Sequence, residues 1–184
     1  GNIPVKRGYI YEDELYKDWI SPTSAVMVRK ELLERVGGFD ESLEARQDYN
    51  LWLRLSEITE FQFVQEPLVV LHVDSTNRLT DNVQGKIEAL STTISDIEQR
   101  IESFPQHKKN KIMANQYFTL ARYLQKKNVF IEARRYILKS IKNNPAKISS
   151  WITLFFILVH KDQEFLGKIR RKLNWKTKRK DKNA

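Results

Sequence analysis

The stretch Ser21–Glu41 reads SPTSAVMVRKELLERVGGFDE, and it decides the fold predicted for the first part of the chain. The short apolar run Ala25–Val28 is typical of a buried strand. Lys30–Val36 has the composition of a short helix. Gly37–Gly38 then ends this helix, because glycine adopts the left-handed conformation of a helix C-terminus without strain. A strand followed by a capped helix is the pattern expected of an α/β unit.

The alternation of helix and strand continues on both sides of this stretch. Upstream, Glu12–Leu15 places acidic residues where the first turn of a short helix is expected. Downstream, Asp48 begins a helix with an apolar face, and two strand-like runs follow at Phe61–Val64 and Leu68–Val73. Residues 1–81 are therefore predicted to form an α/β domain.

Residues 82–160 show a different pattern, with long helical periodicities punctuated by Pro105 and Pro145. They are predicted to form an all-helical domain. Part of this region has the residue spacing of a tetratricopeptide repeat, at Tyr117, Leu120, Ala121, Leu124, Ala133, Ile137 and Pro145.

The repeat-like pattern begins a second time, since Trp151 lies 34 residues after Tyr117. An ordinary helical hairpin fits the same residues equally well. Fewer than three repeats are marginally stable alone, so we expect this region to pack on a neighbouring helix or on a partner protein.

Three motifs in order resemble family 2 glycosyltransferases of the GT-A fold: SPTSAVMVRKE from Ser21, VGGFDE from Val36, and QDYNLWLRL from Gln47. The match covers about a third of the chain, and the order and spacing of the motifs are more specific than any one of them. The resemblance implies a hexosyltransferase-like enzyme of cell-envelope glycan synthesis. Such an enzyme moves a sugar, with inversion, from a nucleotide-sugar donor to a hydroxyl of a glycan or lipid-linked acceptor.

The resemblance assigns the catalytic base to Asp48, although spacing alone favours a residue that only caps its own helix. Gln47 stands where the family commonly has Glu, and it is a substrate-binding candidate together with Trp52, which equally suits a core position. Arg78 could bind the donor diphosphate. His72 is the candidate metal ligand, although a lone histidine beside a strand is often structural.

The family also needs a nucleotide-binding half whose Asp-X-Asp motif holds Mg²⁺ or Mn²⁺, and only about 20 residues precede the matching segment here. Glu12–Glu14 is a poor substitute because no apolar strand leads into it. We therefore expect the metal ligands to lie outside this chain and the chain to be inactive alone. The alternative is a non-catalytic helical adaptor or binding module that retains a remnant of the glycosyltransferase.

The net charge of +9 is unevenly distributed, because residues 1–80 are acidic and the remainder is basic. Residues 161–184 hold ten basic and three acidic side chains interleaved with apolar ones, which predicts a basic amphipathic tail on an anionic membrane surface. A solvated end fits equally well, and no nucleic-acid-binding motif accompanies the charge. The absence of cysteine and of a signal peptide favours the cytoplasm, with the tail at the inner face of the membrane.

Overall fold

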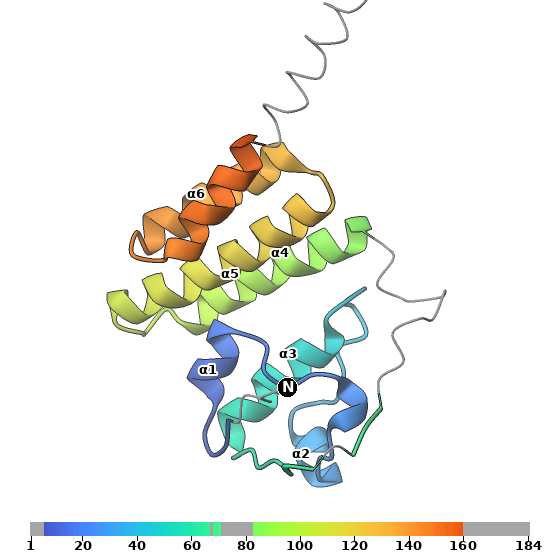
Figure 1. Cartoon of the computed structure of the whole chain (residues 1–184). Coiled ribbons are helices and arrows are strands. Elements are labelled where there is room, and N and C mark those ends of the chain that lie inside the picture. Colours follow the sequence, from blue (N-terminus) through green and yellow to red (C-terminus); the bar gives the residue numbers. More distant parts are fainter. Residues whose placement is uncertain (1–5, 67, 71–82, 160–184) are drawn as a thin grey trace, which may run out of the picture. The chain divides into compact units, whose positions relative to one another are not determined.

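The computed structural model describes residues 6–66, 68–70 and 83–159. The chain divides into two compact units, residues 1–116 and residues 117–184. Each unit is described by itself below, with the element labels of Figure 1. The long helix α5 (Gln106–Lys126) begins in the first unit and continues into the second.

The first unit is helical within its described residues. It contains α1 (Tyr11–Tyr16), the 3-10 turn η1 (Thr23–Ala25), α2 (Lys30–Arg35), α3 (Gln47–Ile58), α4 (Val83–Arg100) and the start of α5. Its only β-type pairing among those residues is one isolated antiparallel bridge between Gly8 and Phe61, whose two backbone hydrogen bonds measure 2.7 and 2.8 Å.

The predicted α/β fold is therefore wrong for the described part of the chain, which forms no strand. The backbone at Val26 is extended, as the apolar run Ala25–Val28 suggested. An extended segment becomes a strand only when a neighbouring segment completes its hydrogen bonds. The described residues supply one such partner, Gly8, and only residues 68–70 of the predicted run Leu68–Val73 are among them.

The glycine pair ends α2 as predicted, and both glycines have positive φ, 78° at Gly37 and 67° at Gly38. The Gly37 amide donates to the Glu34 carbonyl at 3.1 Å, and the Gly38 amide donates to the Leu33 carbonyl at 2.9 Å. These are the two hydrogen bonds of a Schellman cap. Arg54 on α3 holds the same turn through its guanidinium, which donates to the carbonyls of Val36 and Gly38.

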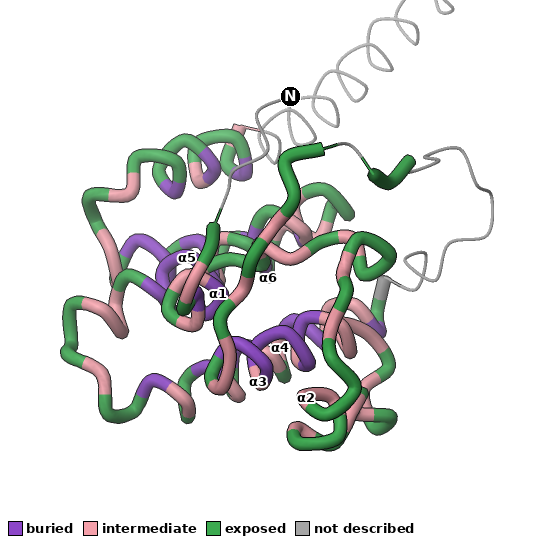
Figure 2. Tube along the Cα trace, turned by 90° about the horizontal axis from the view of Figure 1, so that it is seen from below, coloured by how far each residue is buried: buried purple, intermediate pink, exposed green. Residues whose placement is uncertain are grey.

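A core cluster of the first unit forms around α3, where buried residues are concentrated (Figure 2). Trp52 is buried with Leu51 and Leu55, and partly buried apolar residues pack on them: Ile20, Val26, Val28, Leu32, Leu33, Val36 and Phe61. The spacing of this apolar stripe is why residues 47–58 fold as an amphipathic helix.

Polar contacts join α1 to α3 and to α5. The Tyr49 hydroxyl of α3 donates to the Glu14 carbonyl at 2.6 Å, and the two helices lie side by side in Figure 1. The Asn115 side chain of α5 donates to the Tyr16 carbonyl at 2.6 Å, and that of Gln116 donates to the Leu15 carbonyl at 2.7 Å. These bonds satisfy carbonyls at the end of α1, where a helix leaves its last acceptors open.

The second unit packs the end of α5, α6 (Phe130–Asn143) and a helix over residues 148–159. Ala121 and Ala133 are fully buried, and side chains this small allow close packing. The Tyr117 and Tyr136 rings stack with centroids 6.2 Å apart. The arrangement is helical as expected for this region, and the tetratricopeptide resemblance stays a prediction. No described helix is long and apolar enough to cross a membrane.

Candidate functional site

Asp48 lies in the first turn of α3, one residue after the helix begins. Its Oδ2 accepts a hydrogen bond from the Thr23 hydroxyl at 3.0 Å, and its Oδ1 accepts one from the Tyr49 amide at 2.8 Å. Thr23 belongs to the Ser-Pro-Thr motif, so two of the three sequence motifs meet at this carboxylate.

Arg46 precedes α3 in the left-handed conformation, with φ of 64°. Its guanidinium lies over the Tyr49 ring, 4.2 Å from the centroid. The buried Nε of Arg46 has no hydrogen-bond partner among the described residues. This guanidinium acts on two nearby carboxyl groups, Glu14 and Asp18, and lowers the pKa of each.

Two further carboxyl groups, those of Glu14 and Asp18, interact with the charge of Arg46. Burial raises the pKa of Glu14 to about 7, although the Trp19 and Ile20 amides donate to its carboxylate and lower that pKa in part. Partial removal from water also raises the pKa of Asp18; nearby Arg46 lowers it, and the Asp48 charge raises it. We refer to Glu14, Asp18, Arg46 and Asp48 as the carboxylate cluster.

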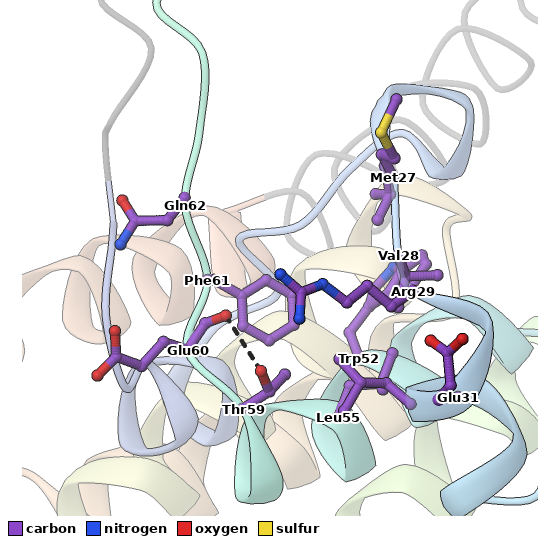
Figure 3. Close-up of a pocket in the computed structure, with 12 residues that line it drawn as sticks. Met27, Val28, Arg29, Glu31, Trp52, Leu55, Thr59, Glu60, Phe61 and Gln62 are labelled. Atoms are coloured by element: carbon purple, nitrogen blue, oxygen red, sulfur yellow. Dashed lines mark hydrogen bonds between the residues drawn. The ribbon is translucent and has the colours of Figure 1, made fainter.

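Trp52 lies one helical turn after Asp48, and its indole is 2% exposed, so it is mainly a core residue. It also lines an open hollow of about 630 Å³. In Figure 3 the extended residues Met27–Arg29 and Glu60–Gln62 border this hollow, with Trp52 and Leu55 between them. The indole Nε1 of Trp52 is itself buried and has no hydrogen-bond partner among the described residues.

The other predicted site residues have different positions. Gln47 opens α3, and its side-chain amide donates to the Leu43 carbonyl at 2.6 Å, which orders the preceding loop. His72 and Arg78 lie outside the described residues. Within the described ranges, no group of three or more His, Asp or Glu side chains is placed to hold a metal ion.

The sequence reasoning identified Asp48 and missed its neighbours. Glu14 and Asp18 are four residues apart, a spacing that can place two side chains on one side of a helix, but α1 ends at Tyr16 before Asp18. Arg46 carried no signal, since nothing in its surroundings predicted a left-handed backbone. Thr23 belongs to one of the three motifs, but the sequence indicated no role for its hydroxyl.

Comparisons of the chain with protein-family models, with curated proteins and with solved structures find no match. The three motifs and the hydrogen bond from Thr23 to Asp48 are the observations that bear on function.

Proposed function

We propose that this chain is the acceptor-side part of a sugar transferase that uses a nucleotide-sugar donor, with Asp48 as its general base. The observation that carries the proposal is the Asp48 carboxylate at the start of α3, held by the Thr23 hydroxyl at 3.0 Å. The motifs that contribute these two residues are also those that resemble family 2 glycosyltransferases. The proposal concerns the chemistry of this site and does not require the GT-A sheet.

The proposed step is a single inverting displacement. The acceptor hydroxyl oxygen forms a bond to the anomeric carbon of the sugar while the bond from that carbon to the diphosphate oxygen breaks. The nucleoside diphosphate leaves with the electron pair of that bond, and the hydroxyl proton passes to the Asp48 carboxylate. A carboxylate placed by the protein typically contributes about 10²–10⁴-fold in rate as a general base.

The neighbours of Asp48 prepare it for this role. Thr23 donates to Oδ2 and fixes the orientation of the carboxylate, so Thr23 acts as a positioning residue. Arg46 is the nearby cation that offsets the accumulated negative charge, as its effect on the pKa of Asp18 indicates. The hollow beside Trp52, one turn along α3, offers a partly apolar surface for part of the acceptor.

The donor side of the reaction needs groups beyond those described here. A divalent cation would neutralise the diphosphate as it leaves, and the proposal places its ligands in a nucleotide-binding region. This chain alone is therefore proposed to bind UDP-sugars and Mn²⁺ weakly or not at all.

The test is a transfer assay on the natural polypeptide that carries this sequence, with a panel of labelled nucleotide-sugars, Mn²⁺ and membrane-derived glycan acceptors. We expect label to appear in the acceptor with at least one donor. The exposed apolar surface of the second unit favours the alternative, a non-catalytic adaptor. Absence of both transfer and donor hydrolysis across the panel, with a folded protein, would favour that alternative and contradict the proposal.

A further inference from the structure

The helix over residues 148–159 exposes the side that an amphipathic helix normally buries. Ser150, Thr153 and Ile157 point into the second unit and are at most 3% exposed. The residues on the outward side are large and apolar: Ile148, Trp151, Ile152, Phe155, Phe156 and Leu158, which we call the aromatic face. Their exposed fractions run from 38% at Leu158 to 72% at Ile148. A continuous apolar surface of this kind marks a site of contact.

Cationic side chains border the aromatic face. Phe156 lines a hollow of about 510 Å³ together with Arg122, Lys126 and Phe130. Both Arg122 and Lys126 are exposed. Residues 117–159 as a whole carry eight basic side chains and one acidic side chain, a net charge of +7. The partner of this surface should therefore combine an apolar interior with negative charge.

We propose that the aromatic face docks on an anionic phospholipid bilayer, with the aromatic side chains in the interface and Arg122 and Lys126 at the headgroups. Aromatic side chains are common at the membrane interface, where the hydrocarbon side is apolar and the headgroup side is hydrated. Apolar burial and attraction to anionic lipid together determine the strength of such binding. No described helix spans the bilayer, so the contact is interfacial.

Charge distinguishes a bilayer from the two other occupants that the chain itself could provide. Residues 161–184 also carry a net charge of +7, so covering the aromatic face with this segment would bring two strongly basic parts together. A second copy of the unit would oppose +7 with +7 in the same way. An anionic bilayer is attracted to both parts. The inference is independent of the proposed transferase activity, because it uses no residue of the carboxylate cluster.

The test is flotation of the full chain with vesicles of phosphatidylglycerol and phosphatidylcholine, and with vesicles of phosphatidylcholine alone. Wild-type protein should float with the anionic vesicles only, and less at high salt. The double substitution Ile152→Ser with Phe155→Ser should lower the partition coefficient about tenfold or more, since two exposed apolar side chains are lost. Met27→Ser, which removes a side chain that is 99% exposed in the first unit, is the matched control.

Arg122→Gln with Lys126→Gln provides a second variant that leaves the apolar packing intact. It should weaken flotation at low salt and change it little at high salt. The proposal is overturned if the Ser variant floats like wild type, because binding would then belong to another segment. It is also overturned if wild type binds neither vesicle, or if sedimentation shows a dimer that only the Ser variant loses.

Discussion

Glu14 gives the sharpest test of the energetics of the carboxylate cluster. Its side chain is fully buried, and burial raises its pKa from an ordinary value of about 4.5 to about 7. The folded protein therefore binds this proton more tightly than the unfolded chain between those two pH values. Unfolding releases the proton in that range, so the stability contributed by Glu14 falls as pH rises from about 4.5 to about 7 and is constant above.

The shift of about 2.5 pH units corresponds to about 3 kcal/mol, since each unit is worth about 1.4 kcal/mol. Glu14→Gln removes the ionisation and keeps an oxygen that can accept from the Trp19 and Ile20 amides at 3.2 Å. The unfolding free energy of this variant minus that of wild type should therefore increase by about 3 kcal/mol as the pH is raised from 4.5 to 8. Urea denaturation at a series of pH values measures that difference.

Glu12→Gln is the matched control, because Glu12 is an exposed residue of the same helix, paired with Lys108 at 2.6 Å. Its stability relative to wild type should change by less than about 1 kcal/mol over the same pH range. Carbon-13 NMR of the Glu14 carboxyl gives an independent titration with an expected midpoint near pH 7. A midpoint near 4.5, together with a pH-independent difference for Glu14→Gln, would refute the reasoning.

Substitutions at three positions test the local packing of the two units. Gly37→Ala should cost about 1–2 kcal/mol in urea denaturation because φ is 78°, and Gly37→Asn should cost less; equal stability of all three proteins would contradict the cap. Arg54→Lys should cost about 1–3 kcal/mol, because lysine lacks the planar guanidinium whose two separate NH2 groups donate to the Val36 and Gly38 carbonyls; an unchanged melting temperature would exclude that role. Ala133→Leu should cost about 1–3 kcal/mol by overpacking the second unit, whereas a stabilised protein would show that space is available there.

The sequence predicted the local elements better than the fold class. Helix α2, its glycine cap and the apolar stripe of α3 follow from short-range patterns that the structure retains. The error lay in converting extended runs into a sheet, because pairing depends on a partner that the local pattern cannot specify. Val26 is extended and packs against the core, yet among the described residues only Phe61 pairs, with Gly8.

At the candidate site too, local structure was predictable from the sequence and contacts between separate segments were not. A helix beginning at Asp48 could be predicted from composition and motif, and the structure begins α3 one residue earlier, at Gln47. The contacts of Asp48 with Thr23, and the charges of Glu14 and Asp18 around Arg46, arise from the packing of separate helices. Trp52 shows why residue type alone assigns roles poorly, since it is both a core residue and part of the wall of a hollow.

The most direct test of the proposed function is the rate of sugar transfer at saturating donor for Asp48→Asn in the natural polypeptide that carries this sequence. Asparagine keeps the shape and most of the hydrogen bonding of Asp48 and caps a helix about as well, so the melting temperature should barely change. Transfer should fall by about 10²–10⁴-fold. Gln47→Glu and the surface variant Asp13→Asn should stay within about tenfold of wild type, because neither alters the proton acceptor. Transfer by Asp48→Asn within a few-fold of wild type would show that the Asp48 carboxylate is not the proton acceptor, and would contradict the proposed mechanism.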